Sequence, residues 1–157
     1  MKTLITPEQV VTLAFGDGEY VAPDAVREAD IAAAEHRYIR PIVGGRLCET
    51  LAEGRYAALL DDYVAPALAM AVRTMLQRAI NVCTGQAGLV VADSEGAKAA
   101  PTAAADALQR SLVRRRRALV RRLSEHLCSE RESYPEYNPA EDAAQHCSID
   151  GNIIQVY

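Results

Sequence analysis

RYAALLDDYVAPALAMAVRTMLQRAINVC, residues 55–83, is the stretch that decides the fold. Its apolar side chains recur at helical spacing, and on a helix they would be distributed around the whole circumference and not along one narrow stripe. A helix that is apolar over so wide an arc is packed on several sides. We therefore expect one long central helix here. Pro66 should kink or split it near Tyr63, because proline removes a backbone donor and clashes with the preceding turn.

The flanking sequence predicts further helices and little sheet. Thr6-Pro7-Glu8-Gln9 is typical of a helix start, with Thr6 and Gln9 able to form a capping box. The other expected elements are a helix from about residue 23 to 38, a turn over 40–45, a short helix over 46–52, a β-type run over 88–92 with a turn at 93–96, a linker over 97–102, a long helix over 102–131, and an apolar strand-like end over 149–157.

These elements predict an all-α fold, a small helical bundle around the long central helix. A minor β-hairpin or flap and an extended C-terminal tail complete it. The chain has 157 residues, of which 50% are hydrophobic, which is enough for one core. We expect one helical domain over residues 1–131, with a flexible excursion over 85–101. An irregular, partly extended tail follows over 132–157.

Composition excludes several classes of protein. No run of apolar residues is long enough for a membrane-spanning helix. The first residues lack the apolar stretch of a secretory signal, so we expect the protein to stay where it is made. The net charge of −4 argues against a protein whose whole surface binds nucleic acid. No catalytic signature stands out, so we expect no enzyme and no cofactor.

The cysteines and histidines do not form a paired metal-ligand motif. Zinc sites recruit ligands in close local pairs, and the only such combinations are His126 near Cys128 and His146 beside Cys147. A site built from these four would require two distant segments to meet. Buried thiols in a reducing compartment are the alternative that we favour, and we predict no bound metal.

The last long helix concentrates positive charge. It holds eight of the 17 lysines and arginines. At 100° per residue, Leu108, Leu112, Leu119 and Leu123 form one stripe, with Leu127 at its margin. One set of arginines forms a ridge on the opposite face, and Arg115 and Arg116 fall beside or within the leucine stripe. The ridge consists of Arg110, Arg114, Arg117 and Arg121, and the remaining basic residues of the segment are Arg122 and Arg131.

Three interpretations of this helix compete. It can be an ordinary solvated face, although like charges four residues apart cost a few tenths of a kcal/mol per pair. It can bind nucleic acid through phosphates, although the chain has one Phe and no Trp for base stacking. It can also bind a protein, since both ends of the chain are acidic and a copy of the chain can complement itself head to tail. The acidic residues are Glu8, Asp17, Glu19, Asp24, Glu28 and Asp30 in front, and Glu130, Glu132, Glu136, Glu141, Asp142 and Asp150 behind.

Part of the sequence resembles a known family. An amphipathic helix over 30–38, then Ile39-Arg40-Pro41-Ile42-Val43-Gly44, a short helix, and Tyr63-Val64-Ala65-Pro66-Ala67-Leu68-Ala69 are similar to the small helical head–tail connector (adaptor, head-completion) proteins of tailed bacteriophages and prophages. The later Gly88-Leu89-Val90-Val91-Ala92-Asp93-Ser94-Glu95-Gly96-Ala97-Lys98, Pro101 and the closing helix also resemble that pattern. The resemblance spans residues 6–130, without the arginine density of the last helix or the tail after Pro139.

The resemblance implies a structural function. Such a protein forms a ring of identical subunits on the portal, contacts tail-completion proteins, and lets double-stranded DNA pass without reading its sequence. It would lie in the virion neck, and in the bacterial cytoplasm during assembly, with no membrane and no small-molecule substrate. We expect the interface to include Arg110, Arg114, Arg115, Arg116, Arg117, Arg121 and Arg122. The docking tail would consist of Ile149, Ile153, Ile154, Val156 and Tyr157, adding as a strand to a partner. A small helical nucleic-acid-binding protein that uses the arginine helix is the alternative, and a helical enzyme or metal protein is a third.

Overall fold

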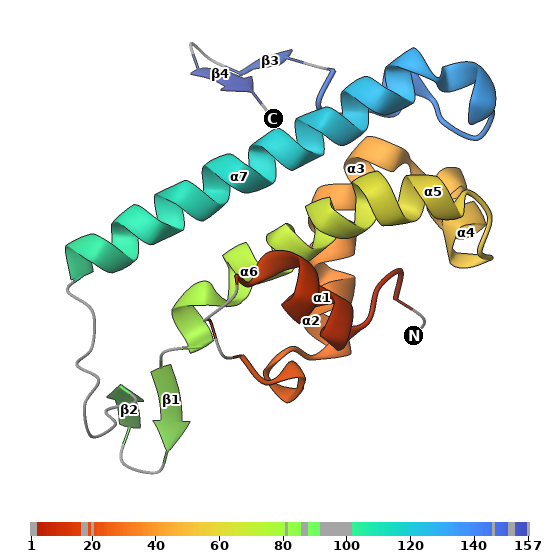
Figure 1. Ribbon diagram of the computed structural model, residues 1–157. Helices are drawn as coiled ribbons and strands as arrows, with labels where there is room; N and C mark the ends of the chain where they lie inside the picture. The colour runs from red at the N-terminus through yellow and green to blue at the C-terminus, as the bar shows by residue number, and fades with distance from the viewer. Residues whose placement is uncertain are drawn as a thin grey trace.

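The computed structural model describes residues 3–16, 19, 21–80, 82–85, 88–91, 102–145, 147–150 and 153–156. Most of them are helical, which confirms the predicted all-α class (Figure 1). In chain order the elements are α1 (Pro7–Ala14), a 3₁₀ turn η1 (Pro23–Ala25), α2 (Glu28–Ala34), a π-helical segment η2 (Glu35–Ile39), α3 (Arg40–Val43), α4 (Gly45–Ala52), α5 (Ala57–Leu59), a second π-helical segment η3 (Leu60–Val64), α6 (Ala65–Ile80), β1 (Val82–Gly85), β2 (Gly88–Val91), α7 (Thr102–Ser129), the 3₁₀ turns η4 (Arg131–Ser133) and η5 (Pro139–Glu141), β3 (Cys147–Asp150) and β4 (Ile153–Val156).

Helix α6 lies at the centre of the packing. Six consecutive residues, 67–72, are buried, so the helix has neighbours around its whole circumference. It contacts α1 and α2 on one side and α7 on the other (Figure 1). Small side chains such as Ala67, Ala69 and Ala71 allow these neighbours to approach closely. The wide apolar arc of the sequence therefore does mark a helix that is enclosed on several sides.

The central helix differs from the expected single helix at both of its ends. Tyr56 adopts a left-handed conformation with φ 57°, so the helical run begins only at Ala57. The helix is not split near Tyr63, because it runs without a break through the π-helical segment η3 into α6. The prediction that the helix continues to Cys83 is wrong, because α6 ends at Ile80 and Val82–Gly85 is a strand. Valine and threonine in this short stretch favour an extended backbone.

A turn was predicted over residues 40–45, and this is also wrong. Arg40–Val43 is helical and continues directly from the π-helical segment η2. In η2 the N–H of Arg40 reaches back five residues to the carbonyl of Glu35, which shifts the hydrogen-bond register just before Pro41. A proline without an N–H is therefore accommodated instead of ending the helix. The chain turns at Gly44, whose φ of 82° suits glycine.

Two pairs of short strands are present. Strands β1 and β2 are antiparallel and align Val82 with Val91. Strands β3 and β4 are antiparallel and align Cys147 with Val156. The sequence placed a β-type run over 88–92 followed by a turn at 93–96. The observed pairing instead joins 88–91 to the preceding residues, and 92–101 lie outside the described residues.

Three further helix expectations are confirmed. Thr6 caps α1, and the reciprocal bond from Gln9 completes the capping box. The short helix α4 and the long helix α7 lie close to their predicted bounds. The prediction of one helix from about residue 23 to 38 is wrong at its start, because Pro23–Ala25 is the separate 3₁₀ turn η1 and the helix begins at Glu28 before it continues through η2. Within the described residues, no helix is both long and apolar enough to cross a membrane.

Candidate functional site

The strongest candidate site is the outer face of α7. Six of the seven candidate arginines are exposed, and the seventh, Arg116, is half-buried. The opposite face holds Leu112, Leu123, Ser124 and Leu127 in the core. Leu108, which the predicted stripe would bury, is 40% exposed. The six exposed arginines are Arg110, Arg114, Arg115, Arg117, Arg121 and Arg122.

The exposed ridge forms no ion pair with any other described residue. The ion pairs formed by described residues involve Arg55, Arg73 and Arg78. None of them includes Arg110, Arg114, Arg117 or Arg121, so among described residues no carboxylate lies within ion-pair distance of this ridge. Four guanidiniums spaced four, three and four residues apart therefore repel one another along one helix edge. Contact with a negatively charged partner would therefore stabilise this face.

Two arginines of α7 do have partners inside the protein, and both partners are tyrosines. The guanidinium of Arg116 lies 4.3 Å from the ring centroid of Tyr38, and that of Arg122 lies 4.7 Å from Tyr63. Both arrangements are cation–π contacts. Burial is the main cause that lowers the pKa of Arg116, and nearby Tyr38 opposes it. These two arginines hold α7 on the core and are not free for a partner.

The two tyrosines occupy equivalent places in the fold. Tyr38 is the fourth residue of η2, and Tyr63 is the fourth residue of η3. Each is followed by a β-branched residue, one further residue and a proline, as Tyr38-Ile39-Arg40-Pro41 and Tyr63-Val64-Ala65-Pro66. This four-residue pattern is visible in the sequence alone. Its meaning depends on the π-helical register that precedes each proline.

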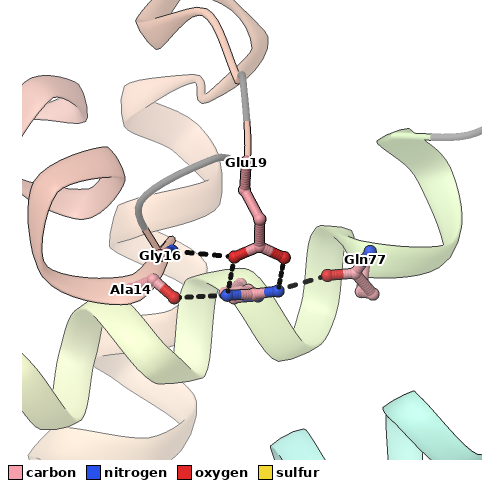
Figure 2. Close-up of polar contacts among 5 residues, drawn as sticks. Ala14, Gly16, Glu19 and Gln77 are labelled. Carbon is pink, nitrogen blue, oxygen red and sulfur yellow. Dashed lines mark hydrogen bonds and ion pairs between the residues drawn. The ribbon is translucent and has the colours of Figure 1, made fainter.

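On the other side of α6, Arg73 forms a buried polar cluster (Figure 2). It donates two hydrogen bonds to the Glu19 carboxylate, at 2.6 and 2.9 Å, and one to the Ala14 carbonyl at 2.5 Å. Its Nε bonds Gln77, and Phe15 lies against the guanidinium with its centroid at 4.5 Å. Hydrogen bonds from Arg73 first, and from the Gly16 N–H second, lower the pKa of Glu19. Four of the five guanidinium donors form these bonds, so the cluster joins Ala14 and Glu19 to α6.

The acidic residues divide into engaged and available groups. Glu19 pairs with Arg73, Glu136 accepts from Tyr56, and Glu141 accepts from Asn138. Asp17 lies outside the described residues, and the side chain of Asp150 is not described. Several others are exposed and, within the described part of the chain, form no ion pair. This available group includes Glu8, Asp24, Glu28, Asp61, Asp62, Glu130 and Glu132.

Asp142 anchors the segment after α7. Its carboxylate is fully buried and accepts hydrogen bonds of 2.6 Å from both Ser124 on α7 and Tyr137. A third bond comes from the backbone of Ala144 at 2.8 Å. Burial raises the pKa of Tyr137, and the Asp142 carboxylate raises it further. The network is inaccessible and complete, so it has a structural role.

The residues of the metal hypothesis do not assemble a site in the described part of the chain. His126 stacks on Tyr63 at 3.9 Å, and its Nε2 lies 3.2 Å from the Tyr134 hydroxyl. Cys128 lies 3.4 Å from the Tyr137 hydroxyl. His146 is outside the described residues, and the side chain of Cys147 is not described. No group of three ligand-type residues suitable for a metal occurs among those that the structure describes.

The predicted docking tail falls mostly within β3 and β4. Ile149 aligns with Ile154, and Asp150 aligns with Ile153. Val156 lies opposite Cys147, while Tyr157 lies outside the described residues.

Comparison with known protein families gives a match over most of the chain. The model of a family of unknown function, DUF6712, matches residues 34–146, which is well over half of the chain. The matched stretch contains both Tyr-β-branched-x-Pro segments and the whole of α7. No curated protein and no solved structure matches the sequence significantly.

Proposed function

The chain belongs to DUF6712, a family of unknown function, and we propose that it is a head–tail connector of a tailed bacteriophage or prophage. In this proposal, identical subunits form a ring on the portal and join the capsid to the tail. Each subunit is a small helical bundle around α6 that acts as a structural part and not as an enzyme. Its place would be the virion neck, reached from the bacterial cytoplasm during assembly.

The exposed ridge of α7 is the observation that carries this proposal. Arg110, Arg114, Arg117 and Arg121 have no carboxylate partner among the described residues. Arginine suits a subunit interface, because its planar guanidinium binds carboxylates in a bidentate way and is weakly hydrated. The resemblance of residues 30–44 and 63–69 to connector proteins then selects the kind of assembly.

The C-terminal strands supply a second docking element for the proposed assembly. A two-stranded sheet such as β3–β4 has backbone groups at its outer edges that a further strand can bind. Ile149, Ile153, Ile154, Val156 and Tyr157 would add such a strand to a portal or tail-completion protein.

Co-expression with the portal protein of the same phage or prophage tests the proposal. We expect the two proteins to co-purify as a large complex, and electron microscopy of that complex to show a ring of this chain on the portal. Replacing Arg114 and Arg117 by glutamate should reduce the recovery of the complex. Absence of any complex with the unmodified chain, in low and high salt, would contradict a connector function.

A nucleic-acid-binding protein is the second candidate, since the same ridge presents four guanidiniums to solvent. Each neutralised phosphate contributes about 0.9 to the slope of log affinity against log salt concentration. Binding to duplex DNA should then weaken steeply with salt, and the Arg114→Ala, Arg117→Ala double variant should reduce the slope by about 2. An unchanged slope in this variant would remove the ridge from consideration as a phosphate-binding surface.

A further inference from the structure

We propose that the arginine ridge of α7 binds the opposite, acidic side of a second copy of this chain. The ridge consists of Arg110, Arg114, Arg117 and Arg121, and the acidic face of α1, η1 and the start of α2 carries Glu8, Asp24 and Glu28. This inference rests on the proposed function and names the partner surface that a ring of such subunits would use.

The two charged surfaces lie in different layers of the fold. Helices α1 and α2 pack on α6 from one side, and α7 packs on it from the other (Figure 1). The turn η1 lies against α1, which places Asp24 in the same layer as Glu8. Because α6 separates the layers, the ridge and the acidic face cannot neutralise each other within one chain. The same separation suits a heterologous contact, in which one face of a subunit binds the other face of the next.

The acidic residues after α7 are the weaker counterpart. Asp142 is buried, Glu136 accepts a hydrogen bond from Tyr56, and Glu141 accepts one from Asn138. Glu130 and Glu132 stay exposed, but they follow directly on the helix that carries the ridge. The α1–η1–α2 face is available and lies in the opposite layer.

Charge reversal on each face, alone and together, tests this pairing. The ridge variant is Arg114→Glu with Arg117→Glu, and the acidic-face variant is Asp24→Arg with Glu28→Arg. Sedimentation and light scattering at low salt should show oligomers for the unmodified chain. We expect each variant alone to weaken this self-association about tenfold or more, because like charges then face each other. Circular dichroism should show both variants to be as helical as the unmodified chain.

Complementation separates a direct pairing from a general charge effect. An equimolar mixture of the ridge variant and the acidic-face variant should assemble again, since each supplies the face that the other needs. A chain that carries all four substitutions should also assemble by itself. A variant that had merely misfolded would not recover in either experiment.

Two control variants change the net charge equally at other exposed positions. Arg46→Glu with Arg131→Glu matches the ridge variant, and Glu130→Arg with Glu132→Arg matches the acidic-face variant. We expect both to assemble as the unmodified chain does. The pairing is wrong if the unmodified chain stays monomeric at low salt, if complementation fails, or if the Glu130/Glu132 variant is the one that loses assembly. Ring formation on the portal in spite of such a result would leave the connector proposal standing and overturn only this inference.

Discussion

At the scale of single residues, Arg73 shows how a charge is held inside the fold. Its side chain is 5% exposed, while its partner Glu19 is 44% exposed. A buried guanidinium is tolerated when it is paired and hydrogen-bonded. Here four of its five donors bind the Glu19 carboxylate, the Ala14 carbonyl and the Gln77 amide, and the Phe15 ring lies against it. The pair joins the loop after α1 to the central helix, so it helps to fix the layer that carries Glu8 and Asp24.

We predict that Glu19→Gln destabilises the protein in a pH-dependent way. At neutral pH it should lower the free energy of unfolding by about 1–3 kcal/mol, because Arg73 loses its counter-charge, with the exposure of Glu19 favouring the lower end. The folded-state pKa of Glu19 lies below its usual 4.5. Its contribution is therefore complete above that pH and is lost as the pH falls through the folded-state pKa. Urea denaturation between pH 3 and 7 measures this.

The control for this prediction is Glu49→Gln, an exposed carboxylate of α4. It should leave both the stability and its pH dependence close to those of the unmodified chain. If Glu19→Gln shows the same loss of stability between pH 5 and 3 as the unmodified chain, the ion pair does not cause that loss.

At the scale of elements, the two π-helical segments determine how α7 packs against the core. A π-helical turn shifts the side-chain positions that follow it, and such turns are frequent at functional or strained positions. Here each one places a tyrosine where an arginine of α7 lies against it. The arginines of α7 thus have two distinct roles. Arg116 and Arg122 attach the helix to the core, and the four of the ridge face outward.

We predict that the ring of Tyr63 matters more than its hydroxyl. Tyr63→Ala should destabilise the protein by about 2 kcal/mol, because it removes the stacking with His126 and the contact with Arg122. Tyr63→Phe keeps the ring and should change stability by less than about 0.5 kcal/mol. Thermal denaturation of the two variants measures the difference. Equal losses would show that the hydroxyl, and not the stacked ring, holds this position.

We predict that Asp142→Ala loosens the segment after α7. It leaves the Ser124 and Tyr137 hydroxyls without their buried acceptor, which should cost about 2–3 kcal/mol. Hydrogen exchange should then become faster across residues 137–145, while α6 keeps its protection. Glu141→Ala, which removes a neighbouring exposed carboxylate, is the control and should have little effect. Unchanged exchange in Asp142→Ala would contradict an anchoring role.

At the scale of the whole molecule, charge is distributed by layer. The net charge of −4 hides a basic outer face on α7 and an acidic face beyond α6. Neither face is neutralised within the described residues of one chain. In our proposal, this distribution makes the molecule a subunit that binds the next copy head to tail, as the proposed ring requires.

We predict that self-association falls with ionic strength. Charges between exposed faces are screened over about 10 Å at 0.1 M salt and about 3 Å at 1 M. Light scattering should therefore show smaller species in 1 M than in 0.05 M sodium chloride. Sodium sulfate at equal ionic strength strengthens apolar contacts and serves as the comparison. Oligomers that grow with both salts would indicate an apolar interface and not the ridge.

The sequence alone determined the helical class, the capped start of α1 and the enclosed central helix. These follow from local rules of periodicity and capping. It also determined that α7 carries a ridge of arginines, since side-chain direction along a helix follows from residue spacing. It could not place Pro41 inside a helix, because that depends on a π-helical register whose cost the surrounding packing offsets.

Only the tertiary structure decided which charges have partners. Glu19 and Arg73 are 54 residues apart, and nothing in their local sequence joins them. Arg116 and Arg122 look like members of the basic run, yet the tyrosines of two distant π-helical segments engage them. An ion pair or a stack depends on the distance between side chains in the folded chain. Residue spacing fixes that distance only within one helix, whereas the packing of α1, α6 and α7 fixes it everywhere else.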